Sequence, residues 1–349
     1  MSRSLRVERL KRRELLFLAG AAAARAADAP LGVGVLGAVH SHAAEKLRIL
    51  RGSADWRLVG VCEDDAGVAA RLREEGVPLI SRQALLAHPE IKVIVVESAV
   101  RDHARDARDA LRAGKHVHLE KPPAVHLRDL LELVELARKS ELLVEVGYMW
   151  RYHPGICRAM EAARAGWLGE VYLVKAQIGN QLAARRRPEW AEFRGGVMFE
   201  LGCHLIDAMV RLLGPPVRVT PFLRRDGAFS DPLHDNTCAV LEWGRALGII
   251  TASTLQVNAQ RHRALEIHGT NGCAVVNPLE PPRLTIELEK PAGPYAAGGQ
   301  TIPLPAYRRY EDDFRELAAA VRGQARLRVS LEEEVQVQRA LLAASGMAQ

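Results

Sequence analysis

The sequence predicts an α/β protein in which a doubly wound parallel sheet is followed by an α+β domain with an open, mainly antiparallel sheet. Two observations predict this order. From residue 31 to about 148, short apolar runs alternate with helical stretches, which is typical of a parallel sheet wrapped by helices. Beyond that point, strand-like runs follow one another without intervening helices, which is typical of antiparallel strands. A chain of 349 residues accommodates both domains, which we place at residues 30–150 and 151–349.

Continuous apolar runs mark the strands of the first domain, as expected for strands buried on both faces. They cover residues 31–36, 57–62, 77–80, 92–96, 116–119 and 142–148. Helical patterns lie between them, for example at 104–113 and 127–139. Ligands of such sheets bind at the carboxyl ends of the strands, and nucleotide binding is the default expectation.

The second domain is expected to begin with a helix at 155–165, a strand at 171–179 and a helix at 197–213. Three strand-like runs follow, at 238–243, 247–254 and 263–270. The tail from residue 310 to 347 has a helical pattern, in which Ser330 precedes Glu333 by the three residues of a capping box.

Residues 1–26 predict an export signal. The pair Arg12-Arg13 precedes ten apolar residues (15–24), and Ala24-Arg25-Ala26 fits a small-x-small cleavage site. The segment resembles a twin-arginine signal, so we expect export to the periplasm, with a cytoplasmic protein if the signal is not functional. An N-terminal amphipathic helix that stays on the protein is the alternative.

Most of the positive charge belongs to this segment. The formal net charge of the chain is +6, and seven basic residues against two acidic ones give residues 1–26 a charge of +5, which leaves +1 for the rest. The basicity therefore gives no support for a nucleic-acid partner. Ten apolar residues are also well short of the roughly 20 that span a bilayer, so stable membrane insertion is not expected.

A tight turn after the first strand is the candidate phosphate-binding loop. Gly32, Gly34 and Gly37 spell Gly-x-Gly-x-x-Gly, but that fingerprint requires a preceding strand, so the strand runs through the first two glycines. With the turn at Gly37, the next fingerprint position is Val39, and only the first glycine is kept. Glu63 ends the second strand, where a carboxylate suits a ribose 2′-hydroxyl and repels a 2′-phosphate, so we expect NAD, with NADP as the alternative. A solvated acidic turn is the other interpretation of Glu63.

Two further motifs suggest catalytic residues. The fifth run ends in His116-Val-His-Leu-Glu120-Lys121-Pro122, which places a lysine at the carboxyl edge of the sheet. In the second domain, Glu200, His204 and Asp207 have the i, i+4, i+7 spacing of one helix face. Glu200 is therefore expected to orient His204 as a general base. A structural role is the alternative for a lone helical histidine.

These motifs together resemble the glucose-fructose oxidoreductase, inositol dehydrogenase and MocA family (Gfo/Idh/MocA). The resemblance covers the chain from about residue 31 and includes HVHLEKP, VGYMWRY, LGEVYLV and GGVMFELGCHLID. It implies a Rossmann domain that binds NAD or NADP, a second domain that forms the substrate pocket and a subunit interface, and a homodimer or homotetramer. Family members commonly oxidise or interconvert sugars and polyols.

The resemblance also assigns roles to individual residues. Lys121 matches the lysine that contacts the reacting hydroxyl and the nicotinamide, His204 matches the catalytic histidine, and Glu200 takes the place of the usual aspartate. Residues implied at the cofactor are Gly37, Val39, His40, Glu63, Ser98, His103, Glu120 and Lys121. The chain departs from the family pattern at Val39, at His42 and at Ser98-Ala99-Val100, which replaces Thr-Pro-Asn.

The leading hypothesis is NAD(P)-dependent oxidation of a secondary hydroxyl of a sugar, polyol or sugar derivative. Free NAD is scarce outside the cytoplasm, so export favours a tightly bound cofactor that is recycled within one turnover. Two alternatives stay open: an NAD-dependent glycosidase or lyase that oxidises C3 transiently, and a non-catalytic carbohydrate-binding member of the family.

Position along the chain suggests substrate-binding residues at Arg151, Tyr152, Trp190, Arg194 and Asp207, whose aromatic rings and donors suit a carbohydrate. No metal site is predicted. A site made by His40, His42, His116 and His118 would fit the residue types, but strand histidines usually have structural roles.

Overall fold

A five-stranded parallel sheet forms the first domain of the computed structural model, which describes residues 29–348. The predicted signal at 1–26 lies outside the described residues. The strands are β1 (Leu31–Leu36), β2 (Trp56–Cys62), β3 (Ile91–Val96), β4 (His116–Leu119) and β5 (Val144–Val146), in the order β2-β1-β3-β4-β5. β1 and β3 lie side by side at the point where the strand order reverses, and ligands of such sheets bind in the crevice beyond the carboxyl ends of these strands.

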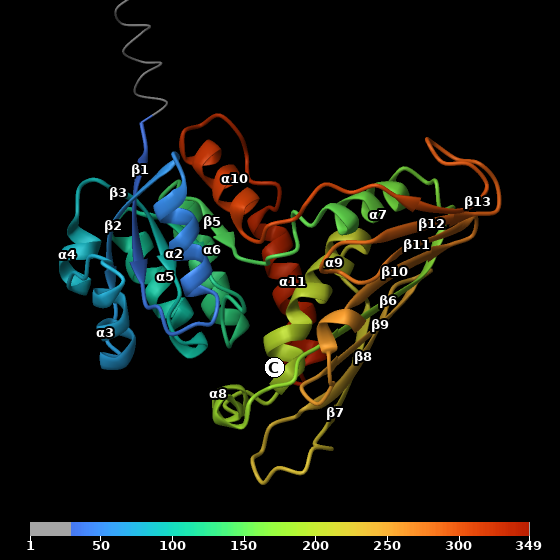
Figure 1. Ribbon diagram of the computed structural model, residues 1–349, viewed down its shortest axis with the longest axis horizontal. Coiled ribbons are helices and arrows are strands. Elements are labelled where there is room, and N and C mark those ends of the chain that lie inside the picture. The colour runs from blue at the N-terminus through green and yellow to red at the C-terminus, as the bar shows by residue number, and fades with distance from the viewer. Residues whose placement is uncertain (1–28, 349) are drawn as a thin grey trace, which may run out of the picture.

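Helices cover both faces of this sheet, which confirms the doubly wound arrangement (Figure 1). Alternate residues of β3 separate onto the two faces: Val93 and Val95 pack in one apolar cluster, Ile94 and Val96 in the other. The first cluster includes buried residues of α2 (Ala43–Gly52) and α3 (Ala66–Glu74). The second includes those of α4 (Arg82–Ala87), α5 (His103–Arg112) and α6 (Leu127–Lys139).

One predicted strand does not form as expected. Residues 77–80 make an isolated parallel bridge between Leu79 and Val61 rather than a sixth strand. Pro78 has no N–H to donate, and Ser81 already caps the N-terminus of α4, so the extended segment is too short for a ladder.

The second domain is built on an eight-stranded sheet in the order β13-β12-β11-β10-β6-β9-β8-β7. Every pairing in it is antiparallel except β6–β9, so the expectation of a mainly antiparallel sheet is confirmed. The strands are β6 (Val171–Gly179), β7 (Arg218–Arg224), β8 (Asn236–Glu242), β9 (Leu247–Ser253), β10 (Ala264–Gly269), β11 (Gly272–Val276), β12 (Leu284–Leu288) and β13 (Gly298–Ile302).

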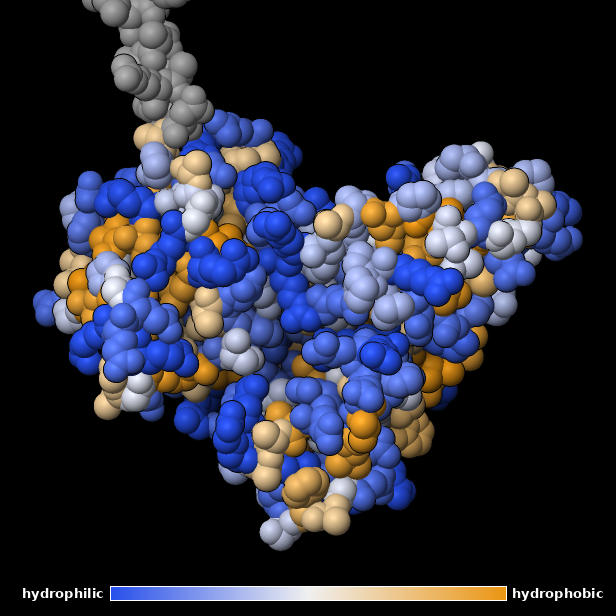
Figure 2. Space-filling model, in the orientation of Figure 1, coloured by the Kyte–Doolittle hydropathy of each residue, from blue (hydrophilic) through white to orange (hydrophobic). Residues whose placement is uncertain are grey.

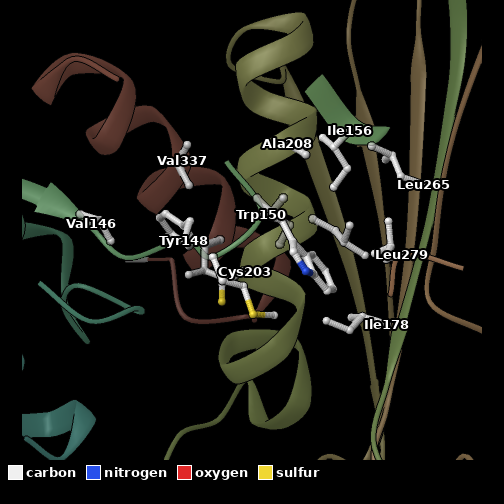
Figure 3. Packing of buried hydrophobic residues seen from close by; sticks show 14 of the residues in the cluster. Val146, Tyr148, Trp150, Ile156, Ile178, Cys203, Ala208, Leu265, Leu279 and Val337 are labelled. Atoms are coloured by element: carbon white, nitrogen blue, oxygen red, sulfur yellow. The ribbon is translucent and has the colours of Figure 1, made fainter. Parts of the chain in front are cut away.

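One face of this sheet is covered by α7 (Pro154–Arg164), α9 (Cys203–Leu213) and α11 (Leu331–Ala344) (Figure 1). Trp150 lies in the apolar layer between α9 and the sheet, and Tyr148, Cys203 and Val337 lie on the side of α9 that faces α11 (Figure 3). The same apolar cluster continues into the first domain, and α10 (Glu311–Val321) reaches it through Phe314. The predicted capping box of Ser330 and Glu333 is present at the start of α11.

The helix predicted at 197–213 is interrupted where the sequence places Glu200. Residues Met198–Gly202 form a π-helical turn, and α9 begins only at Cys203. A short 3₁₀ turn (Ala184–Arg186) and the five-residue helix α8 (Arg187–Ala191) lead into this segment from β6. Among residues 29–348, no helix is both long enough and apolar enough to cross a lipid bilayer.

Candidate active site

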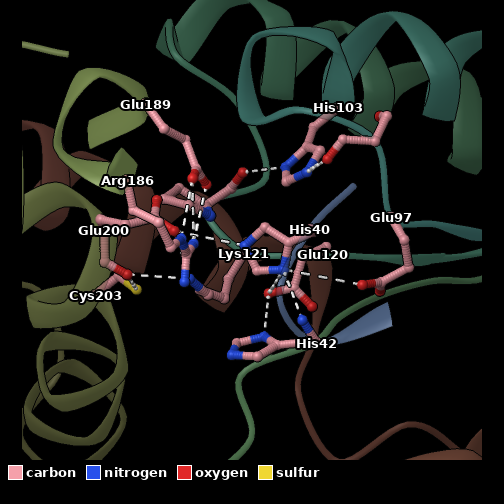
Figure 4. A network of polar contacts seen from close by, with 12 residues as sticks. His40, His42, Glu97, His103, Glu120, Lys121, Arg186, Glu189, Glu200 and Cys203 are labelled. Atoms are coloured by element: carbon pink, nitrogen blue, oxygen red, sulfur yellow. Dashed lines mark hydrogen bonds and ion pairs between the residues drawn. The ribbon is translucent and has the colours of Figure 1, made fainter. Parts of the chain in front are cut away.

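The carboxyl ends of β1, β3 and β4 and the π-helical turn before α9 bring together most of the predicted catalytic and cofactor residues (Figure 4). His40 and His42 follow β1, Glu97 and Ser98 follow β3, and Glu120 and Lys121 follow β4. Glu200 enters from the π-turn and His204 from the first turn of α9. This is the crevice position expected for a parallel sheet of this order.

Gly37 allows the turn after β1 to pass very close to the loop after β3. Its φ is +75°, and a Cβ atom at this position would lie 2.5 Å from Ser98 Cα, so an L side chain would be strained and would also clash. Glu63 supports the same turn, because its carboxylate accepts hydrogen bonds from the backbone N–H groups of Ala38 and, at 2.6 Å, of Asp65. Gly37 and Glu63 therefore lie together at the carboxyl ends of β1 and β2, and their contact with a cofactor stays a prediction.

Lys121 and Glu200 form a buried ion pair. Lys121 Nζ donates to Glu200 Oε1 and to the backbone oxygen of Glu200, both at 3.0 Å, and both side chains are at most 4% exposed. Burial would raise the pKa of Glu200, but the charge of Lys121 lowers it to about 2. Burial likewise opposes the charge on Lys121, whose pKa the Glu200 carboxylate nevertheless raises. At neutral pH the lysine is therefore a cationic donor.

His204 is buried next to this pair, and within the described part of the chain both of its ring nitrogens lack a hydrogen-bond partner. Its ring centre lies 5.5 Å from that of Trp150 and 6.0 Å from that of Tyr148. Burial lowers the pKa of His204 well below its usual value, helped by the nearby charge of Lys121. The imidazole is therefore neutral at pH 7, which is the state required of a proton acceptor.

The expected hydrogen bond from Glu200 to His204 is absent. Neither ring nitrogen of His204 has a partner among residues 29–348, because the Glu200 carboxylate is paired elsewhere. The carboxylate of Glu200 faces Lys121 and His40 instead. The prediction that Glu200 orients His204 is therefore wrong for this structure.

Lys46 and Glu97 belong to the site, although the sequence analysis did not select them. Lys46 Nζ, on α2, donates to Glu97 Oε1 at 2.5 Å and to Glu120 Oε2. All three side chains are at most 1% exposed. Two sequence signals could have identified them: a lysine on the apolar face of α2, and a glutamate directly after the third apolar strand.

Burial has different effects on the pKa values of Glu97 and Glu120, because their neighbours differ. It raises the pKa of Glu97 to about 7, because the charge of Lys46 offsets only part of the burial and Glu120 adds repulsion. It would also raise the pKa of Glu120, but Lys46 and the imidazoles of His42 and His40 lower that pKa well below its usual value. Glu120 is therefore the ionised partner of Lys46.

His40 and His42 point into the centre of this network (Figure 4). His42 Nδ1 lies 3.0 Å from Glu120 Oε1, and His40 Nδ1 lies 3.8 Å from the same oxygen. On its other side, His40 Nε2 faces Glu200 Oε1 at 3.5 Å. His40 therefore connects the carboxylate that pairs with Lys46 to the one that pairs with Lys121. Burial lowers the pKa of His42 to about 3, although Glu120 favours its protonation.

His103 holds two loops of the site together. Its Nδ1 lies 2.8 Å from the backbone oxygen of Pro122 and its Nε2 lies 3.1 Å from that of Ser98. Burial lowers its pKa to about 4, so the neutral ring donates to one of these oxygens at a time. His103 thus fixes the spacing between the ends of β3 and β4.

A cleft of about 460 Å³ opens between this edge of the sheet and α8 of the second domain. Its lining includes Val39, His40 and Ser98 from the first domain and Pro188 and Phe193 from the second. The Ser98 hydroxyl has no partner among residues 29–348. A cleft that holds an unpartnered hydroxyl, next to the tight turn at Gly37 and at the carboxyl ends of the strands, would suit a dinucleotide.

Three of the five proposed substrate residues, Arg151, Tyr152 and Asp207, lie at the domain junction, outside the lining of this cleft. Arg151 Nη2 donates to Asp207 at 2.8 Å and to Glu334 at 2.7 Å, and its other nitrogens bind Glu334 and a backbone oxygen. Tyr152 donates to Glu145 at 3.3 Å and stacks against Arg328. These residues tie β5, α9 and α11 together.

The other two residues are close to the cleft. Trp190 is buried on α8, whose neighbours Pro188 and Glu189 line the cleft, and its indole N–H has no partner. Arg194 is exposed and directly follows Phe193 of the cleft lining. Trp190 and Arg194 are therefore the two of the five that can approach a ligand there.

Comparisons with known proteins agree with this arrangement. Residues 31–148 match the profile of the GFO/IDH/MocA oxidoreductase family with its NAD-binding Rossmann fold. Residues 156–275 match the profile of the GFO/IDH/MocA C-terminal domain. The two matches correspond to the parallel and the mainly antiparallel sheets.

Several characterised and uncharacterised oxidoreductases are similar in sequence. Inositol 2-dehydrogenase of Gluconacetobacter diazotrophicus is 28% identical over 276 residues, 77% of each chain. D-glucoside 3-dehydrogenase of Escherichia coli is 30% identical over 171 residues, 46% of this chain and 48% of that protein. Three uncharacterised oxidoreductases, from Synechocystis sp. and Schizosaccharomyces pombe, are 32–33% identical, but this chain matches only 37–38% of their length.

The fold recurs in a solved structure with cofactor. GenD2 from gentamicin A biosynthesis, in complex with NAD, superimposes with a TM-score of 0.77 at 21% identity, covering 91% of this chain and 94% of that one. At this identity the similarity establishes the shared fold.

Proposed function

The chain belongs to the Gfo/Idh/MocA family of oxidoreductases, and on that premise we propose that it oxidises a secondary hydroxyl group of a sugar, polyol or sugar derivative, with NAD as the hydride acceptor. The names of two relatives support this substrate class, since one is an inositol dehydrogenase and the other a glucoside dehydrogenase.

The observation that carries the proposal is the pairing of a charged lysine with a neutral, unpartnered histidine at the carboxyl edge of the sheet. Lys121 keeps its proton because Glu200 pairs with it, and His204 is free to accept one because no group in residues 29–348 binds its nitrogens. Oxidation of an alcohol needs both states: a donor that polarises the hydroxyl oxygen and a base that takes its proton.

Each residue of the site has a separate role in the proposed oxidation. Bound NAD supplies the hydride acceptor. Gly37, Ser98 and Glu63 would hold the dinucleotide at the turn and at its ribose. Lys121 would donate a hydrogen bond to the reacting oxygen, while His204 takes the hydroxyl proton. Glu200 fixes the ammonium of Lys121 through two contacts, so the donor is oriented before substrate arrives.

We also propose that the chain is exported and keeps its NAD bound between turnovers. The paired arginines of residues 12 and 13 support export, and the scarcity of free NAD outside the cytoplasm favours a retained cofactor. Mass spectrometry of the mature N-terminus tests the first part: cleavage near Ala26 is expected, and an intact Met1 on the exported protein would contradict it.

The substitution His204→Asn tests the mechanism. We expect kcat for sugar oxidation to fall by about 100-fold or more, the usual contribution of a positioned general base, while NAD affinity stays unchanged. His262→Ala is the matched control, because His262 is exposed and distant from the cleft lining. Unchanged turnover in a folded His204→Asn protein would remove His204 from the mechanism.

A further inference from the structure

We propose that His40, His42 and Glu120 form a binding site for a divalent transition-metal ion such as Zn²⁺ at the centre of the buried network. Each of these residues offers one ligand atom, and the three atoms all lie within 4.8 Å of one another. All three side chains are largely buried, with exposures of 2%, 17% and 0%. Two imidazoles and one carboxylate, with a coordination position left open, are a ligand set typical of catalytic metal sites.

The distances are close to those of a coordinated ion. Nitrogen and oxygen ligands lie about 2.1 Å from zinc, so two ligands of a tetrahedral ion are roughly 3.4 Å apart. Glu120 Oε1 lies 3.0 Å from His42 Nδ1 and 3.8 Å from His40 Nδ1. These two separations lie on either side of the value for a coordinated ion, and all three ligand atoms lie within 4.8 Å of one another.

The surroundings of the ligands match the second layer of a metal site. His40 Nε2 faces the Glu200 carboxylate at 3.5 Å, and His40 Nδ1 lies 3.4 Å from the backbone N–H of His42. This places the ring proton on Nε2 and the lone pair on Nδ1, where a bound ion would replace the long contact with the backbone N–H of His42. A carboxylate behind a histidine fixes the tautomer and the ring orientation of metal ligands in the same way.

Glu120 is oriented in a similar way. Its Oε2 accepts from Lys46, and its Oε1 faces the two imidazoles. The two oxygens thus have separate roles: one is anchored to α2, and the other is presented to the proposed ion.

The buried cluster also holds acceptor atoms without a partner. Three carboxyl groups (Glu97, Glu120 and Glu200) share two ammonium groups, those of Lys46 and Lys121. Glu97 Oε2 and Glu200 Oε2 are buried without a hydrogen-bond partner among residues 29–348. Unpaired buried acceptors are costly, and a cation bound in the cluster would offset that cost.

Metal titration of the full chain, purified without a polyhistidine tag and stripped with a chelator, tests this site. We expect calorimetry to show one Zn²⁺ bound per chain, and Co²⁺, used as a spectroscopic probe, to give visible absorption bands of nitrogen and oxygen coordination. His42→Ala and Glu120→Gln should each weaken binding by about 10-fold or more, and His262→Ala should leave it unchanged.

Folding controls keep the test decisive. Circular dichroism identifies any variant that does not fold, and His42→Gln replaces His42→Ala in that case because its amide can still donate to Glu120. Zn²⁺ should also raise the denaturation temperature of the wild type but not of the folded variants. Absence of Zn²⁺ binding to the wild type, or binding that survives in folded His42 and Glu120 variants, would overturn the site. These measurements need neither NAD nor substrate, so their failure leaves the proposed oxidation intact.

Discussion

At the scale of single residues, three ionisable groups of the centre are each held in one charge state by their surroundings. Lys121 is charged because of Glu200, Glu120 is ionised because of Lys46, and His204 is neutral because it is buried without a partner. An alcohol dehydrogenase that works near pH 7 needs such a division between a cationic donor and a neutral base.

Lys46→Met should strongly destabilise the fold. The substitution keeps the length of the side chain but leaves Glu97 and Glu120 buried without their cation, which costs about 3–5 kcal/mol in comparable buried pairs. Denaturant unfolding measures the change, and Lys92→Met, at the exposed second residue of β3, is the control. Equal unfolding midpoints for the two variants would show that the Lys46 network adds no stability.

The sequence indicated Lys121, Glu200 and His204 through their motifs, but it could not indicate how they pair. Lys46 is separated from Glu120 by 74 residues, so their contact depends on the packing of α2 against the ends of β3 and β4. Arg151 and Asp207 were assigned to substrate by their position along the chain. Their burial against Glu334, 183 residues from Arg151, follows only from the docking of α11.

At the scale of elements, the site depends on how closely the β1 turn approaches the β3 loop. Gly37→Ala should therefore reduce NAD affinity and lower the unfolding free energy by about 1–3 kcal/mol, because it adds both a strained φ and a clash with Ser98. Gly76→Ala is the matched control: Gly76 also has a positive φ, of +68°, but a Cβ there meets nothing within 4 Å. If Gly76→Ala weakens NAD binding as much as Gly37→Ala does, the close approach is not what matters.

The packing of α10 against β5 creates a pH-sensitive pair of carboxyl groups. Burial raises the pKa of Asp313 to about 7, and burial together with the charge of Asp313 raises that of Glu145 well above its usual value. Both groups bind protons more strongly in the folded state than in the unfolded state. Their contribution to stability is therefore fully present below pH 4 and is lost as the pH rises through about 7.

Asp313→Asn should consequently flatten the fall in unfolding free energy between pH 5 and 8. Denaturant unfolding across this range measures the effect, and Asp312→Asn, whose side chain is 43% exposed, serves as the control. A wild-type stability that does not fall over this range would contradict the shifted pKa of Asp313.

The limits of helices and strands with a clear apolar periodicity were predictable from the sequence. Features that depend on packing between distant segments were not. The helix at 127–139 and the strands at 31–36 and 171–179 have the predicted limits, because their apolar patterns match their burial. The insertion of β6 between β9 and β10 has no local signal, since both partners lie more than 60 residues further along the chain. The π-turn at Met198–Gly202 likewise has no periodicity that distinguishes it from an α-helix.

At the scale of the whole molecule, the second sheet leaves one face without covering helices (Figure 1). Polar residues cover most of the surface in the same view, and apolar side chains gather at the right-hand edge over the sheet (Figure 2). Tyr172, Phe222 and Leu247 are exposed apolar residues of this sheet, at 50%, 52% and 47%. An uncovered sheet face with exposed apolar residues is a suitable surface for self-association.

The homodimer or homotetramer remains a prediction, and Phe222→Glu tests it. Light scattering after size-exclusion chromatography should show an oligomer for the wild type and a smaller assembly for the variant, because a buried glutamate is costly at an interface. Val217→Glu is the control, since Val217 is 79% exposed and precedes β7. A monomeric wild type would contradict this use of the sheet.

The proposed function depends on hydride transfer from a sugar-type hydroxyl to NAD at Lys121 and His204. The most direct test is the absorbance of reduced nicotinamide when the purified full chain, loaded with NAD, is mixed with single members of a panel of sugars, polyols and glycosides. The account predicts that at least one compound reduces the bound cofactor in the wild type, and that folded His204→Asn protein, with NAD bound, gives no such signal on the same time scale. Reduction at the same rate in both proteins, or a wild-type chain that binds no nicotinamide cofactor, would contradict it.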